Sequence, residues 1–145
     1  MNNADLEKKV KHLVHSLRYE KGFVCAVDVL QLLGYLSKKD YEDWRFGKVE
    51  YLEKACQINL KKLSLIYKLM RKYAVELHLE ESWTGYNRYG KGEKTRLRFS
   101  KSGDAMNEKR YATHYVDKNR MKIVKENKEE KQRTILILDK VLPLP

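Results

Sequence analysis

Cationic side chains recur through one short stretch of the sequence, GYNRYGKGEKTRLRFSKSGD at residues 85–104. Arginines and lysines in a row can donate hydrogen bonds to phosphate oxygens, and tyrosines among them add ring faces on which bases stack. Glycines let the backbone approach a ligand closely. The residues with this chemistry are Tyr86, Arg88, Tyr89, Lys91, Lys94, Arg96, Arg98 and Lys101.

The net charge of the chain is concentrated around this stretch. The 145 residues carry a formal net charge of +11, and residues 82–125 contain twelve cations against four acids. A local surplus of this size attracts polyanions by steering and counterion release. Charge alone does not distinguish nucleic acid from an acidic protein or an anionic membrane surface.

Residue alternation predicts that the stretch is a β-hairpin. Cationic residues alternate with Thr95, Leu97 and Phe99, the period of a half-buried strand, and residues 90–93 are typical of a turn back to a partner strand at 82–89. Cations on one side of a strand lie about 6–7 Å apart, which is comparable to the spacing of phosphates along a nucleic-acid chain. The alternative is a solvated sheet face whose aromatic residues fill the core beneath it.

Most of the remaining chain shows helical periodicity. The predicted helices span residues 4–20, 26–36, 38–47, 48–77 and 104–117. Lys61, Lys68 and Lys72 lie almost opposite the apolar face of the long 48–77 helix, and we expect them, with Arg110 of the last helix, to extend the basic surface. Residues 118–133 are predicted to be a mobile charged linker, and residues 134–145 a strand-like appendage.

These elements together predict an α+β fold in a single globular domain, residues 1–117. A mainly helical body is built on a long central helix and carries the basic β-hairpin. Short helices followed by a hairpin also fit a winged-helix-like arrangement, although a helix as long as 48–77 is unusual for recognition of a DNA groove. The appendage at 118–145 either adds to the sheet, docks on the core or pairs with a second subunit.

The motifs of enzymes are incomplete in this sequence. Residues 85–91 fit the phosphate-loop spacing, but Gly92 stands where a metal-binding hydroxyl is needed and a strand pattern follows. Asp40, Glu42 and Asp43 are typical of an acidic first helical turn, and a packed His114 is favoured over a general base. We therefore predict no catalytic residue, metal site or cofactor, and favour a noncatalytic role.

Cysteine usage and hydropathy bear on the compartment. Cys25 and Cys56 fall within apolar helical patterns, which predicts buried free thiols and a reducing environment. No run of about 18 apolar residues and no signal-peptide pattern occurs. The expected location is cytoplasmic, without membrane association.

Four segments carry a family resemblance: DVLQLLGYLS, DWRFGKVEYLEK, LRFSKSGD and YATHYV. They resemble a family of small bacterial proteins of unassigned function, over roughly residues 25–116. The resemblance implies a common architecture that includes residues 97–104 and 111–116, with the last 28 residues as a variable tail. It implies no activity.

The sequence thus predicts a noncatalytic nucleic-acid-binding module whose hairpin contacts phosphates, with steep salt dependence. The alternative is a protein-interaction module that docks an acidic partner or pairs, as a homodimer or with another chain, through its C-terminal strand. DNA and RNA, and single and double strands, are not distinguished.

Overall fold

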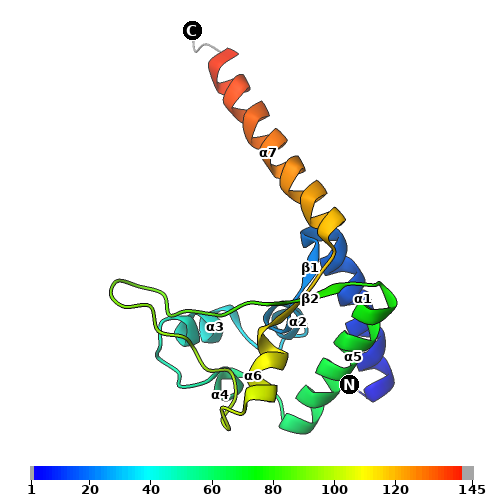
Figure 1. Ribbon diagram of the computed structural model, residues 1–145, viewed down its shortest axis with the longest axis vertical. Coiled ribbons are helices and arrows are strands. Elements are labelled where there is room, and N and C mark those ends of the chain that lie inside the picture. Colours follow the sequence, from blue (N-terminus) through cyan, green and yellow to red (C-terminus); the bar gives the residue numbers. More distant parts are fainter. Residues whose placement is uncertain (1, 142–145) are drawn as a thin grey trace.

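The computed structural model describes residues 2–141 and confirms the α+β class, with helices arranged around a small antiparallel sheet (Figure 1). In chain order its elements are α1 (Asn3–Lys21), β1 (Phe23–Val24), α2 (Ala26–Leu32), α3 (Lys38–Arg45), α4 (Leu52–Ala55), α5 (Leu60–Glu76), β2 (Glu80–Trp83), α6 (Ala105–Ala112), β3 (Thr113–Val116) and α7 (Lys118–Val141).

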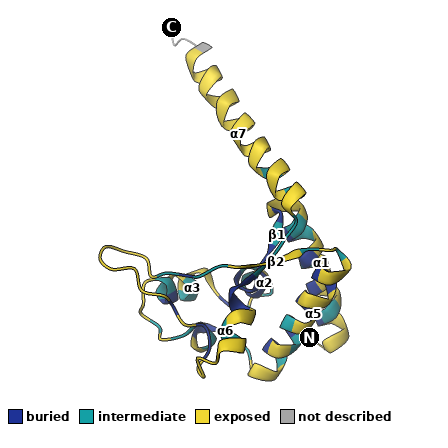
Figure 2. Ribbon diagram, in the orientation of Figure 1, coloured by how far each residue is buried: buried dark blue, intermediate teal, exposed yellow. Residues whose placement is uncertain are grey.

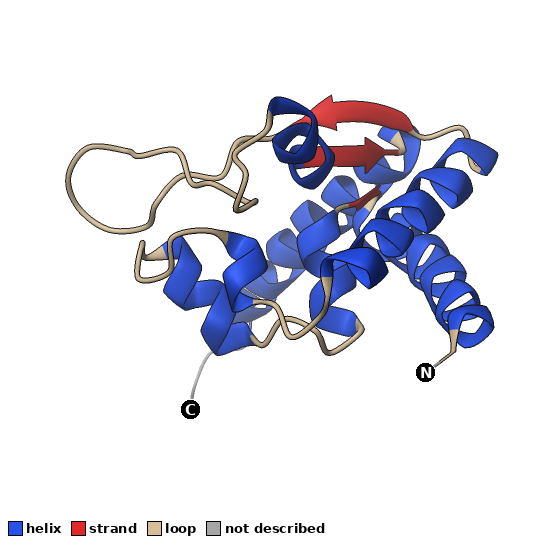
Figure 3. Ribbon diagram, turned by 90° about the horizontal axis from the view of Figure 1, so that it is seen from below, coloured by secondary structure: helices blue, strands red, loops and turns tan. Residues whose placement is uncertain are grey.

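The sheet has the strand order β1-β3-β2, with both pairs antiparallel (Figure 3). Its central strand, β3, falls in a segment that the sequence analysis assigned to a helix over 104–117, and that prediction is wrong beyond Ala112. The sequence Thr113–Val116 is β-branched and aromatic, which suits a central strand with neighbours on both edges. Helix α6 is capped by Asp104, whose carboxylate accepts from the Asn107 amide.

The core is one hydrophobic cluster with an aliphatic part and an aromatic part. Helices α1 and α5 lie side by side, and α1 presents Leu6, Val10, Val14 and Leu17 from one face at helical spacing. The aromatic part surrounds Trp44 of α3, which is 0% exposed. Burial is concentrated in this body, whereas α7 is exposed along most of its length (Figure 2).

The predicted long helix over 48–77 is interrupted. Helix α4 ends at Ala55, Cys56 is extended, and Asn59 begins α5 by accepting a hydrogen bond from the Lys62 amide at 2.8 Å. Asparagine is a favoured N-cap residue because its side chain satisfies an amide that the first turn leaves free. The apolar pattern runs through this break, since both helices pack on the same core.

The predicted C-terminal strand and mobile linker are also wrong where they are described. Residues 118–141 form one helix, α7, and the remaining residues of the predicted strand, 142–145, lie outside the described residues. Lysine, glutamate, glutamine and arginine make up most of the first two thirds of α7, and all four are strong helix formers. The helix continues through Ile135–Leu138, and among the described residues no strand pairs with that segment. The winged-helix-like arrangement stays a prediction.

Candidate nucleic-acid interface

The predicted hairpin is a long irregular ribbon, which we call the basic arm and define as residues 84–101. It leaves the end of β2, reaches past α3 and returns toward α4 and α6 (Figures 1 and 3). The Leu97 amide donates to the Tyr86 carbonyl and the Arg88 amide to the Thr95 carbonyl, both at 2.8 Å. One isolated bridge, between Asn87 and Arg96, replaces the regular strands that were predicted.

The root of the arm is fixed by the aromatic core. The Trp44 indole donates to the Arg98 carbonyl at 2.9 Å, and its ring lies 5.2 Å from Phe99 and 5.7 Å from Tyr86. Leu97 and Phe99 are buried while the arginines beside them are exposed, which confirms the predicted alternation at these positions; Thr95 is exposed. Every second side chain at the root of the arm is therefore buried in the core, and this holds the arm in place.

Tyr86 does not belong to the exposed surface, contrary to its predicted role in stacking on bases. It is buried, shares a 3.0 Å hydrogen bond with Nε2 of His114, and has its hydroxyl pKa raised by burial. His114 is itself packed, with its ring stacked on Phe23 at 5.2 Å. A base could reach Tyr86 only if the core opened.

Two carboxylates hold the chain where the arm ends. Glu108 of α6 accepts from the Phe99 amide at 2.9 Å, from the Ser100 amide at 2.8 Å and from the Ser100 hydroxyl at 2.6 Å. Glu53 of α4 accepts from the Lys101 amide at 2.8 Å and from the Tyr111 hydroxyl at 2.6 Å. Both carboxylates thus accept hydrogen bonds from backbone amides at the end of the basic arm, and neither forms an ion pair with a cation of the arm.

The outer part of the arm is fastened to the end of α3. The Tyr89 amide donates to the Arg45 carbonyl at 2.7 Å, and the Arg45 guanidinium lies 4.0 Å from the centre of the Tyr89 ring. The Phe46 and Tyr89 rings pack edge to face, with their centroids 5.5 Å apart. Arg45 and Phe46 are not among the predicted site residues; their only signal in the sequence is an arginine-aromatic pair at a helix end closed by glycine.

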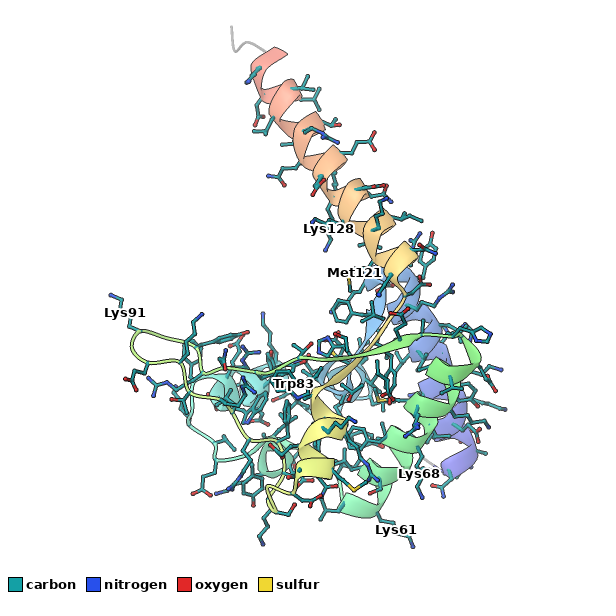
Figure 4. The ribbon with its side chains drawn as sticks, viewed as in Figure 1. Lys61, Lys68, Trp83, Lys91, Met121 and Lys128 are labelled. Carbon is teal, nitrogen blue, oxygen red and sulfur yellow. The ribbon has the colours of Figure 1, made fainter. Side chains whose placement is uncertain are left out.

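The predicted cations of the arm are all exposed. Arg96 lies over Trp83 at 4.5 Å and Arg98 over Tyr51 at 5.4 Å, while Lys91 projects from the tip (Figure 4). The six cations are Arg88, Lys91, Lys94, Arg96, Arg98 and Lys101. Within the part of the chain that the structure describes, none of them forms an ion pair. Tyr89 and Trp83, 41% and 56% exposed, are the aromatic faces that accompany them.

The helical cations do not extend this surface as predicted. Lys61 and Lys68 of α5 lie on the opposite side of the body from Lys91 (Figure 4). Lys72 pairs with Glu7 of α1 at 2.9 Å, which raises the pKa of Lys72 and lowers that of Glu7. Arg110 is exposed on α6, which faces α5 across a groove with Lys68 on its other wall. Of the predicted helical cations, Lys68 and Arg110 thus meet at this groove, apart from the basic arm, whereas Lys61 is not part of its lining and Lys72 is paired with Glu7.

The incomplete enzyme motifs have structural positions of their own. The phosphate-loop-like residues 85–91 lie in the arm and are not followed by a helix. Asp40 and its acidic neighbours lie in α3, where Ser37 provides the N-cap. Within residues 2–141, no three side chains of His, Cys, Asp or Glu are grouped as metal ligands.

No protein-family model, curated protein or solved structure matches the chain. Among the described helices, none is both long and apolar enough to cross a membrane.

Proposed function

We propose that the protein is a noncatalytic nucleic-acid-binding module and that the basic arm is its contact surface. The observation that carries the proposal is the set of six exposed cations, unpaired within the described residues, on a segment whose backbone is fixed at both ends. Cations held in place in this way contact phosphates without first giving up their own ion pairs or ordering a mobile loop.

The exposed aromatic rings fit the same proposal. Tyr89 and Trp83 each carry an arginine over the ring and are 41% and 56% exposed, which leaves ring surface on which an unpaired base can stack. Such contacts tolerate any base. We therefore expect weak sequence preference and a preference for strands with unpaired bases.

The proposal also places the protein in the cytoplasm. Cys25 and Cys56 are free and buried, and burial raises the pKa of each thiol to about 12. Thiols kept protonated and covered are compatible with a reducing compartment.

The test is fluorescence anisotropy of labelled single- and double-stranded DNA and RNA over a salt series. If all six cations contact phosphates of duplex DNA, affinity should fall about a thousandfold between about 50 and 200 mM salt. Arg96→Glu with Arg98→Glu should weaken binding strongly and reduce the salt slope by about two.

A matched control reverses the same number of charges elsewhere. Lys8 and Lys9 are exposed on α1, so Lys8→Glu with Lys9→Glu changes net charge equally while the arm stays intact. Lys61→Glu with Lys68→Glu tests the helical cations separately. Equal losses in all three double variants would show only general charge attraction, and no binding to any probe at low salt would refute the proposal.

A second candidate, a protein-interaction module, is favoured by one observation on α7. Ile135, Leu136, Ile137 and Leu138 are each about half exposed, between 46% and 59%, near the end of this projecting helix. Four consecutive apolar residues exposed to water mark a contact site for another chain. Molar mass measured by light scattering over a range of protein concentrations tests for a homodimer, and the same measurement with an added acidic protein tests for that partner.

A further inference from the structure

A second basic surface surrounds a groove between α5 and α6. The groove has a volume of about 360 Å³, which lies within the usual range for small-ligand sites. Lys68 and Arg71 of α5 line one wall, and Lys109 and Arg110 of α6 line the other. Lys68 and Arg71 are three residues apart, so they share one face of their helix.

Acid groups do not balance this charge. Glu81 of β2 is the one acid among the residues that line the groove, against four cations. In the part of the chain that the structure describes, none of those four cations forms an ion pair. The net positive charge of the groove suits a ligand with more than one negative charge, such as a phosphate monoester.

Apart from Thr113, the rest of the lining is aromatic and apolar. Tyr115 of β3 stands opposite Glu81 in the sheet, is partly buried, and has its pKa raised mainly by that burial. Tyr67 and Met70 of α5 and Met106 of α6 complete this part of the surface. Aromatic and thioether side chains favour a planar ring, whereas inorganic phosphate alone would leave them uncovered.

We propose that this groove binds a nucleotide, with the phosphate between the cations of α5 and α6 and the ring against Tyr67 and Tyr115. The site is separate from the basic arm, and the proposal does not depend on the function assigned to the arm. The same chemistry is offered by a free nucleotide and by the 5′-phosphorylated end of a nucleic-acid chain.

Calorimetric titration of the full chain with AMP tests the proposal, with adenosine and inorganic phosphate as comparison ligands. AMP should bind, and adenosine should bind at least about tenfold more weakly because it lacks the charge-assisted contacts. No heat with AMP at millimolar concentration, or equal affinity for adenosine and AMP, would overturn the proposal.

Paired variants locate the site. Arg71→Gln with Lys109→Gln should weaken AMP binding about tenfold or more, whereas Lys91→Gln with Lys94→Gln, which removes the same charge from the arm, should leave it within about twofold. All four side chains are exposed, so folding should survive, and circular dichroism checks this. A loss of affinity in the arm variant equal to that in the groove variant would also overturn the proposal.

Displacement of a fluorescent AMP analogue separates the two sources of the ligand. A 5′-phosphorylated oligonucleotide that displaces it, where the 5′-hydroxyl form does not, identifies chain ends as ligands. If neither displaces it, the site takes free nucleotides. Equal displacement by both forms would show that the groove does not recognise the phosphate, contrary to the proposal. Binding through the arm is the same for both oligonucleotides and does not affect this comparison.

Discussion

Two segments leave the body of the molecule, the basic arm and helix α7, and they are held in different ways. Trp44 holds the arm at its root, and Arg45 holds it near its tip. Glu108 holds the chain where the arm returns to the body. Within the described residues, helix α7 is attached at its base alone, and all of residues 125–140 are exposed. The arm presents side chains at fixed positions, as direct recognition requires, whereas α7 presents an uncovered apolar end.

The base of α7 nevertheless makes specific contacts with α1. The Asp117 amide donates to the Gly22 carbonyl at 2.8 Å, and the Asp117 carboxylate pairs with Arg18 at 2.9 Å. Arg120 donates to the Tyr19 carbonyl at 2.6 Å and lies 4.0 Å from the centre of the Tyr19 ring. These contacts set the direction in which the helix leaves the body, and each region can therefore be tested at its own attachment.

The largest expected effect on the free energy of unfolding is at the root of the arm. Trp44→Ala removes a fully buried side chain and the donor to the Arg98 carbonyl, so it should lower the free energy of unfolding by about 3–5 kcal/mol. Chemical denaturation measures this. Trp83→Ala is the matched control, because this tryptophan is 56% exposed and its contact with Arg96 is worth about 1 kcal/mol or less. Equal losses would mean that the arm is not fixed through Trp44.

These attachments also show what the sequence could and could not predict. The alternation of Leu97 and Phe99 with arginines is local, and it correctly indicated an extended segment with one buried side. Trp44 and Glu108 act on that segment from distant elements, and no spacing in the sequence connects them to it. Tyr86 was misassigned for the same reason, since a tyrosine among cations looks the same whether its ring faces water or Trp44.

The helices show the same division between local and long-range information. The α1 pattern is amphipathic and capped, and it was predicted almost to its ends. At Ile135–Leu138 the β-branched residues favoured a strand, but strand formation needs a partner and the structure provides none. The cap at Asn59 was a local signal that the continuous apolar pattern masked.

The second-largest expected effect on stability is at the base of α7. Gly22 has a φ of +83° and a Cβ there would overlap the Met121 backbone, whereas Gly34 has a φ of +84° with open space around it. Gly34→Ala should cost about 1–2 kcal/mol for the left-handed conformation alone. Gly22→Ala should cost at least about 1 kcal/mol more, since α7 must also shift.

A truncated chain isolates this contact. In a chain that ends at Asp117, Met121 is absent, and Gly22→Ala and Gly34→Ala should have similar costs in thermal or chemical unfolding. A difference that persists in the truncated chain would place the strain within α1 and would contradict the role assigned to α7.

A smaller effect on stability depends on pH and arises at His114, which is hydrogen-bonded to Tyr86 of the arm. Burial lowers the pKa of His114 below its ordinary value of 6.5, so the folded state favours the neutral ring that bonds to Tyr86. The resulting stability is present above about pH 6.5 and is lost as pH falls through the lowered folded pKa. Denaturation midpoints between about pH 7 and pH 5 should therefore decline, and less so in His114→Gln. The same slope in both proteins would assign the decline to other groups.

The smallest expected effect comes from removal of residues 126–145. This segment contains four cations and four acids, so the net charge of +11 is unchanged, and its described part makes no contact with the arm. Stability should change by less than about 0.5 kcal/mol and nucleic-acid affinity should be retained. A larger loss of stability that grows with protein concentration would show that the apolar end of α7 is covered by a second copy, because only association makes stability depend on concentration. A loss independent of concentration would mean that α7 folds back on its own body, and the contrast between a fixed arm and a free helix would then be wrong.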